Sequence, residues 1–201
     1  MTDQNIILSA LHDDHKIGTF GDFQNKEKQD LLKVKELKNL SIFQIAKFKS
    51  SKIKTESIKI DGLDFPQTFP NVSYNNETRI LWTGPDICIV VSLDKNVKDK
   101  IAKTVNEEDF ATTDLSHSRA VIEISGKNSI DVLKKGTPLN LNSTEFKKNN
   151  SANSSYNGIS FTLDFIEDQN PTFRLFCLRS FGGSFYHSIT DAALEYGYVG
   201  E

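Results

Sequence analysis

Apolar residues along the chain alternate between short runs with strand character and stripes with helical spacing. A run rich in β-branched and aromatic residues at about 40–48 predicts the first strand. Two further runs, 79–82 and 87–93, flank the turn residues at 84–86 and predict an antiparallel hairpin. Residues 50–60 fit either a short helix or an alternating strand, and both interpretations stay open.

Helical spacing follows the hairpin. Apolar residues recur there at i, i+4 and i+8, as Val97, Ile101 and Val105. This stripe predicts a helix with one buried face and with Asp94 as its N-cap. A second helix is predicted between Asn128, a capping residue, and Gly136, which is expected to take a positive φ where the helix ends.

The remainder of the chain repeats this order of strands and helices. Strand-like runs lie at 112–115, 120–125, 159–166 and 172–178. A final amphipathic helix is predicted over 183–196. The stretch 142–157 is rich in Asn and Ser, which cannot bury area or hold a strand register, and it predicts a mobile surface loop.

The related order of elements in the two halves predicts an α+β fold. Residues 1–30 are polar and unpatterned and are expected to form a loose N-terminal arm. Residues 31–201 are expected to form one domain with pseudo-halves of about 31–110 and 111–201. Each half has the element order of a split β-α-β unit of the ferredoxin-like kind, and the two are expected to share a core.

Charge and hydropathy exclude several classes of function. The 201 residues carry 24 basic and 27 acidic side chains, a net charge of -3, so nothing favours a nucleic acid or an anionic membrane as partner. No apolar run approaches the ~18 residues of a membrane span, and the N-terminus lacks the pattern of an export signal. The sequence therefore predicts a cytoplasmic protein.

Cysteine and histidine chemistry points away from redox or metal function. Cys88 and Cys177 are far apart and each lies within an apolar run, which predicts inert thiols in buried strands and a reducing compartment. His12 and His15 flank two aspartates and would suit a divalent metal, but a solvated tail is the preferred interpretation because the arm offers no support for ligands. No metal site is predicted.

No catalytic group is predicted either. Ser184, His187 and Asp191 have the residue types of a nucleophile, a base and an orienting carboxylate, but along one helix they cannot form that relay.

Four residues are candidates for contact with a partner or an anion. Gly182 and Gly183 begin the last helix, whose free amides would suit an anion with Arg179 close by. The alternative is that the two glycines only make it easier for the backbone to start the helix. Arg119, beside His117 in a turn between strands, faces a partner subunit or caps a hairpin. Arginine favours interfaces because its donors are bidentate. Cofactor-binding residues are not predicted.

Three blocks of sequence resemble one known family. The central block, 114–141, has an acidic-serine strand end, a polar turn with arginine, an alternating strand ending in serine and glycine, and a helix ending in lysine and glycine before proline and leucine. The other blocks are 81–86, with tryptophan, glycine, proline and aspartate, and the terminal run 172–193. Their order and spacing are similar to those of the sarcosine oxidase gamma subunit family. The chain departs from the family pattern at Ile87, Cys88 and Thr137.

This resemblance implies a fold like the folate-binding aminomethyltransferase domain and a non-catalytic role. It implies a heterotetrameric complex with alpha, beta and delta subunits, whose sites hold FAD, FMN, NAD, folate and zinc, while this chain binds no cofactor of its own. The resemblance also implies that this complex oxidises sarcosine to glycine, with formaldehyde or methylenetetrahydrofolate and hydrogen peroxide as products.

Two other classes of function remain as alternatives. A free-standing folate-binding one-carbon protein would need a positioned carboxylate, for which Asp114 is the only candidate near a comparable strand end. A self-assembling structural protein would form a stable symmetric oligomer when isolated.

Overall fold

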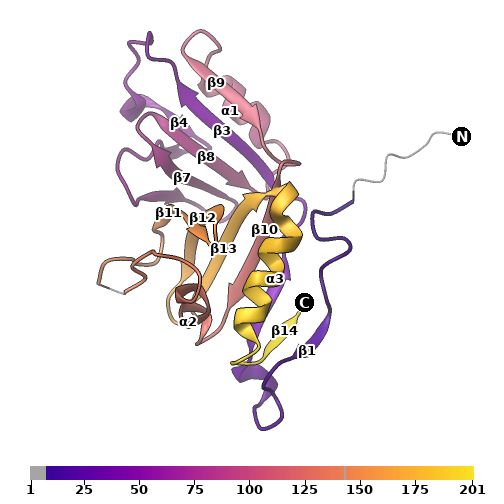
Figure 1. The fold of residues 1–201 in the computed structure, drawn as a ribbon. Coiled ribbons are helices and arrows are strands. Elements are labelled where there is room, and N and C mark those ends of the chain that lie inside the picture. The colour runs from indigo at the N-terminus through magenta and orange to yellow at the C-terminus, as the bar shows by residue number, and fades with distance from the viewer. Residues whose placement is uncertain (1–7, 143) are drawn as a thin grey trace, which may run out of the picture.

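Two β-sheets form the centre of the protein, which is described by a computed structural model over residues 8–142 and 144–201. The five-stranded sheet has the order β6-β7-β8-β3-β9, with bounds Val72–Tyr74, Thr78–Gly84, Ile87–Ser92, Ser41–Lys47 and Phe110–Asp114. The seven-stranded sheet has the order β1-β14-β2-β10-β13-β12-β11. Its strands are Gly18–Phe20, Tyr198–Gly200, Leu32–Glu36, Arg119–Ser125, Thr172–Leu178, Ile159–Glu167 and Ser151–Tyr156. Figure 1 shows the two sheets side by side, with the smaller one at the upper left.

Three α-helices accompany the sheets in the described residues. They are α1 (Val97–Thr104), α2 (Ser129–Lys134) and α3 (Gly182–Ala193). Short 3-10 turns lie at Lys28–Asp30, Thr55–Ser57 and Arg179–Phe181. This mixture confirms the predicted α+β class.

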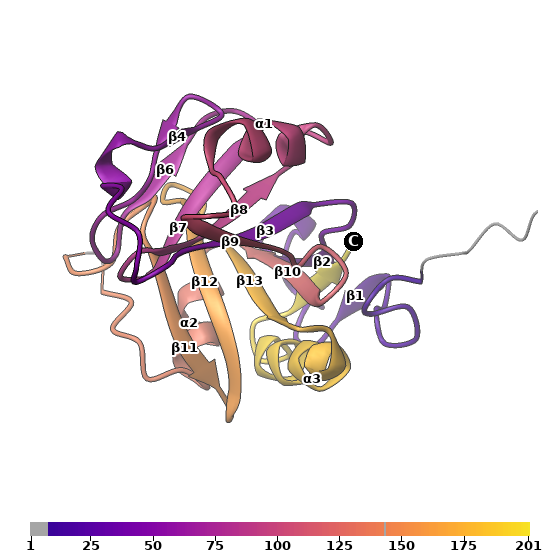
Figure 2. The ribbon, with the colours of Figure 1, turned by 90° about the horizontal axis from the view of Figure 1, so that it is seen from above.

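The layers follow from which face of each sheet is apolar. One face of the large sheet packs on α2 and α3, and one face of the small sheet packs on α1. The two remaining faces meet in a third cluster, in which Val121 and Phe176 of the large sheet contact Leu81 and Ile89 of the small one. Viewed from above, α1 and α3 therefore lie on opposite sides of the molecule with the sheets between them (Figure 2).

The smaller sheet matches the sequence-based expectation closely. The strand predicted at 40–48 is β3, and the predicted hairpin is β7 and β8, which pair antiparallel across the turn. Helix α1 buries Val97 and Ile101 on its predicted face. Its N-cap is Asn96 and not Asp94, whose carboxylate instead accepts the amide of Asn96 at 2.8 Å. Residues 50–60 are mostly irregular and end in β4 (Lys59–Ile60), which pairs with β5 (Leu63–Asp64).

The larger sheet contains a strand from outside the second half. Strand β2 lies between β10 and β14, antiparallel to the first and parallel to the second. Strand β9, in turn, pairs with β3 in the smaller sheet. The division into pseudo-halves at about residue 110 stays a prediction, but the strands do not separate cleanly at that point.

The polar stretch 142–157 was wrongly expected to be a loop throughout. Its second part is β11, the edge strand of the large sheet, which pairs with β12 over its whole length. Ser151 and Tyr156 are fully buried there. The strand is stabilised by pairing and by contact with the small sheet, since the amide of Ser151 donates to the carbonyl of Pro70 at 2.8 Å.

Gly136 ends α2 for a different reason from the one predicted. It is absent from the described residues that adopt a positive φ. A Cβ at this position would lie 2.5 Å from Cζ of Tyr156, whose ring packs directly over the backbone. The glycine is required for this close approach. The hydroxyl of Tyr156 then donates to the carbonyl of Val132 at 2.9 Å.

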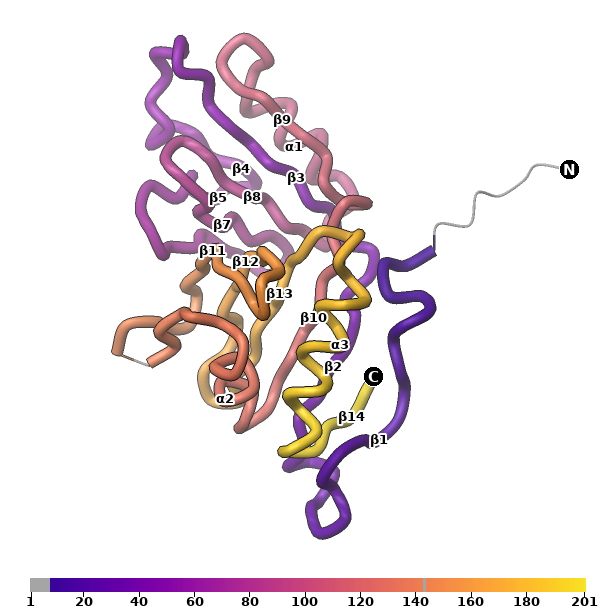
Figure 3. Tube along the Cα trace, viewed as in Figure 1, coloured from indigo at the N-terminus to yellow at the C-terminus, as the bar shows by residue number. Residues whose placement is uncertain are grey.

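The described part of the expected polar arm, residues 8–30, packs on the large sheet. Leu11 is fully buried in the core between that sheet and α3, and β1 pairs with β14. Figure 3 shows this segment running beside α3 before it reaches β1. The segment packs there although it is polar, because only a few of its residues contact the sheet and α3. None of the described helices has the length and apolar character needed to cross a membrane.

Candidate functional site

Two of the predicted contact residues meet at a pocket beside the junction of the sheets. Arg119 begins β10 and Arg179 follows β13, and the register pairs Arg119 with Leu178. Both arginines line a pocket of about 400 Å³, whose other walls come from residues 8–10, the β2–β3 connection and the β9–β10 turn. The pairing of β10 with β13 thus brings together two arginines that are far apart in sequence.

The hydrogen bonds of both arginines are made to neutral oxygens. Arg179 Nη2 donates to the carbonyls of Leu8 and Ser9, at 2.6 and 3.1 Å, and so holds the N-terminal segment against the pocket. Arg119 Nη1 donates to the carbonyl and the hydroxyl of Ser118, at 3.3 and 3.0 Å. Burial lowers the pKa of Arg119, because desolvation disfavours its charged form.

A buried carboxylate lies in the same pocket. The side chain of Glu36 is only 4% exposed. Its Oε1 accepts the amide of Leu11 at 3.2 Å, and its Oε2 lies 3.7 Å from Nζ of Lys38. Glu36 therefore fixes the N-terminal segment to β2 and offsets the charge of Lys38. Sequence reasoning missed it because a glutamate at the end of a strand ordinarily faces solvent.

The other two candidates, Gly182 and Gly183, lie at the start of α3 but face the chain's own N-terminal segment. A Cβ on Gly183 would overlap the carboxylate of Asp14, and one on Gly182 would lie 3.1 Å from Cβ of Ala120 on β10 and 3.3 Å from Cδ2 of Leu11 on the N-terminal segment. The helix start therefore already has a carboxylate against it, which its dipole favours. The glycines allow the segment to approach closely.

The helix residues that imitate a catalytic relay do not form one. His187 Nε2 lies 3.2 Å from Oδ1 of Asp14, on the N-terminal segment, and the carbonyl of Ser184 accepts the hydroxyl of Ser188 at 3.0 Å. Across 8–142 and 144–201, no group of three or more His, Cys, Asp or Glu side chains could hold a metal ion. His12 lies 4.0 Å from the exposed carboxylate of Asp13.

Both thiols are buried, as predicted. Cys88 and Cys177 are 0% and 1% exposed. Burial raises the pKa of Cys88 far above its usual range and that of Cys177 to about 11, so both are protonated near neutral pH. The strands β8 and β13 carry them as small apolar side chains.

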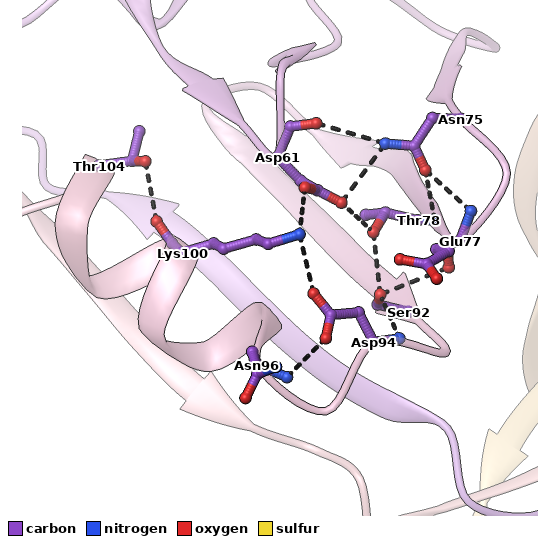
Figure 4. A network of polar contacts seen from close by, with 9 residues as sticks. All are labelled: Asp61, Asn75, Glu77, Thr78, Ser92, Asp94, Asn96, Lys100 and Thr104. Carbon is purple, nitrogen blue, oxygen red and sulfur yellow. Dashed lines mark hydrogen bonds and ion pairs between the residues drawn. The ribbon is translucent and has the colours of Figure 1, made fainter.

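A polar network joins α1 to the small sheet and to the β4–β5 turn (Figure 4). Lys100, on α1, contacts Asp61 at 2.5 Å and Asp94 at 2.8 Å. The hydroxyl of Thr78 donates to Asp61 at 2.6 Å and lies 2.9 Å from Oγ of Ser92. The network gathers charge from three separate elements, which local sequence patterns do not reveal.

The ionisation of this network follows from its contacts. Burial opposes ionisation of Asp61, but the hydrogen bonds from Lys100, Thr78 and Asn75 outweigh it, and the pKa of Asp61 lies below its usual range. The hydrogen bonds to Asp61 and Asp94 raise the pKa of Lys100. All three groups are charged near neutral pH, and their contacts hold α1 against the small sheet.

A buried ion pair connects the two sheets. Arg79 of β7 donates from Nε and Nη2 to the two oxygens of Asp164 of β12, at 2.6 and 2.7 Å. Burial raises the pKa of Asp164, and the bidentate contact with Arg79 opposes that rise. Asn149 and the ring of Tyr74 complete the surroundings of the guanidinium. This pair fixes the relative position of the sheets.

The described residues thus provide binding and positioning groups, and the fold is one found in solved structures. Of these, heterotetrameric sarcosine oxidase from Corynebacterium sp. U-96, in complex with pyrrole 2-carboxylate, has a TM-score of 0.76 at 22% identity, over 85% of this chain and 87% of that one. The glycine cleavage system aminomethyltransferase T from Bartonella henselae has a TM-score of 0.58 at 9% identity, over 86% of this chain and 49% of that one. The fold is therefore of the aminomethyltransferase type, and the chain spans about half of that enzyme.

The family follows from the sequence match. The sarcosine oxidase, gamma subunit family matches residues 54–195, well over half of the chain. The chain belongs to this family. No curated protein matches it.

Proposed function

We propose that the chain is the non-catalytic gamma subunit of a heterotetrameric sarcosine oxidase. The observation that carries this function is the family match over residues 54–195. The fold agrees with it, because a chain of a heterotetrameric sarcosine oxidase superposes on 85% of this one. Its role is to support assembly of the complex with alpha, beta and delta subunits.

The chemistry of the complex belongs to the partner subunits in this proposal. Sarcosine is oxidatively demethylated to glycine, and the methyl carbon leaves as formaldehyde or methylenetetrahydrofolate while oxygen is reduced to hydrogen peroxide. FAD, FMN, NAD, folate and zinc are bound by the other chains. Some described residues support this division, because Arg79 and Asp164 form a buried ion pair, Lys100 pairs with Asp61, and both thiols are buried. We place the complex in the cytoplasm.

The alternative of a free-standing folate-binding one-carbon protein is less well supported. The carboxylate that it would need, Asp114, is at the exposed end of β9 and accepts the amide of Ser116 at 2.9 Å. The chain also spans only about half of the aminomethyltransferase whose fold it shares.

Co-expression with the large flavoprotein subunits of the same host tests the proposal. We expect a stoichiometric complex that retains the flavin absorption and the sarcosine-dependent oxygen uptake, while the purified chain alone is colourless and inactive. Omitting the chain should lower the yield of assembled complex. A chain that purifies alone and binds a reduced folate would contradict the proposal in favour of the alternative.

A further inference from the structure

The pocket that contains Arg119 and Arg179 carries an excess of positive charge on an acidic chain. Five cationic side chains line it against two carboxylates, although the whole chain has a net charge of -3. Two of the cations have a carboxylate nearby. Lys38 lies 3.7 Å from Glu36. Burial opposes ionisation of Asp114, but the hydrogen bonds from Ser116 outweigh it and lower its pKa, and the nearby His117 and Lys98 add to that lowering.

The other three cations contact only neutral oxygens among the described residues. Arg119 donates to Ser118, and Arg179 donates to the carbonyls of Leu8 and Ser9. The ammonium group of Lys95 donates to the carbonyl of Asn39. Neutral partners satisfy the hydrogen-bond donors but leave the positive charge uncompensated. A carboxylate supplies both the hydrogen bonds and the opposite charge, so it stabilises a half-buried guanidinium most.

Exposed apolar side chains flank these charges. Leu8, which lines the pocket, is 49% exposed, and Leu178, the register partner of Arg119, is 45% exposed. Arginine set among apolar side chains is typical of protein interfaces, whereas a site for a small anion has no need of an apolar rim.

We propose that this pocket is the docking site for an acidic segment of a partner subunit, whose carboxylates pair with Arg119 and Lys95 while apolar residues beside them cover Leu8 and Leu178. Arg179 acts here as a positioning residue, because it holds the N-terminal segment that forms one wall. The inference rests on the proposed function and names the surface and the chemistry through which the chain joins its complex.

Charge reversal at Arg119, measured on the complex, tests this site. We expect Arg119→Glu to raise the Kd of the chain for its co-expressed flavoprotein subunits at least about 30-fold at low salt, and Arg119→Met to raise it less. Lys127→Glu is the matched control, because Lys127 is exposed beyond the opposite end of β10 and the variant has the same net charge. It should change Kd less than about twofold. Lys95→Glu, at an exposed position, should weaken binding about tenfold and keeps the test valid if Arg119 variants unfold.

Cross-linking identifies what occupies the pocket. A photoreactive residue at His117, which is exposed and lines the pocket, should cross-link to a segment of one partner subunit that is rich in Asp and Glu. A cross-link to a neutral segment, or no cross-link in the assembled complex, would overturn the inference. Tight binding of citrate by the isolated chain, lost in Arg119→Met while subunit affinity is unchanged, would assign the pocket to a small anion and also overturn it.

The outcomes separate the two proposals. If the wild-type chain joins the subunits and Arg119→Glu and Lys95→Glu join them equally tightly, the docking site is wrong and the proposed function stands. If the wild-type chain does not join them at all, the proposed function fails and the docking site fails with it.

Discussion

Helices α1 and α3 occupy comparable places, each covering the outer face of a sheet, but they are attached by different forces. Helix α3 buries Phe185, Tyr186, Ile189 and Ala193 almost completely. Helix α1 buries only Val97 and Ile101 and adds the ion pairs of Lys100 with Asp61 and Asp94. The same architecture therefore tolerates either apolar or ionic attachment. The two attachments should respond differently to truncation, salt and pH.

The largest effect is expected where apolar attachment is broken. Phe185→Ala should lower the free energy of unfolding by about 4 kcal/mol, because the fully buried ring leaves a cavity among Tyr156 and Phe161. Urea unfolding of the purified chain measures this change. Phe181→Ala, at a residue 48% exposed on the preceding turn, should stay within about 0.5 kcal/mol of wild type. Equal losses in the two variants would contradict the apolar account.

A somewhat smaller effect is expected at the pair that joins the two sheets. Asp164→Ala should cost about 3 kcal/mol, because it leaves the guanidinium of Arg79 buried without its carboxylate. This loss is at the low end of the range expected for breaking a buried ion pair, because Arg79 keeps its contacts with Asn149 and the ring of Tyr74. The double variant Arg79→Met, Asp164→Leu should recover most of the stability in the same urea measurement. If the double variant is as unstable as Asp164→Ala, the lost stability comes from the ion pair itself and not from the uncompensated charge of Arg79.

Ionic attachment is tested at α1. Lys100→Met should lower Tm by about 2–4 °C at low salt, because it leaves the carboxylates of Asp61 and Asp94 facing each other. High salt screens that repulsion, so the deficit should shrink in 1 M NaCl, whereas the Phe185→Ala deficit should not. Lys103→Met, at an exposed position on the same helix, is the control and should change Tm little at either salt concentration.

The smallest effect is a dependence on acid. The pKa of Asp61 is lower in the folded chain than in the unfolded one, so its contribution to stability is fully present above the ordinary aspartate value, about 4. The contribution is lost as the pH falls through the lowered value. Asp61→Asn should therefore be less stable than wild type at pH 7, and the gap in Tm should close below about pH 4. A gap that widens in acid would contradict this sign.

Sequence patterns predicted those parts of the fold in which local and tertiary preferences agree. Strands β7, β8 and β13 have strong apolar runs, and α1 and α3 have clear stripes. Strand β11 escaped prediction because its Asn and Ser residues are ordered by pairing with β12, which no local pattern encodes. Strand β2 carried a signal, the alternation of Leu32 and Val34 with lysines, that the polar surroundings obscured.

The candidate site was only partly predictable for the same reason. Arg119 and Arg179 were identifiable by residue type alone. Their shared pocket depends on the register of β10 with β13, and the wall formed by Leu8 and Ser9 depends on a contact across almost the whole chain. The carboxylate of Asp14 against the start of α3 is a contact of the same long-range kind.

The insertion of β2 between β10 and β14 has a consequence for how the chain folds. The large sheet is complete only when segments from the beginning, the middle and the end of the described sequence have met. The entropy of closing these long loops is therefore lost before most of the strand pairing can stabilise the sheet. Such a topology favours slow folding in one cooperative step. A cut near residue 110 would deprive the large sheet of β1 and β2 and the small sheet of β9, so neither half would carry a complete sheet.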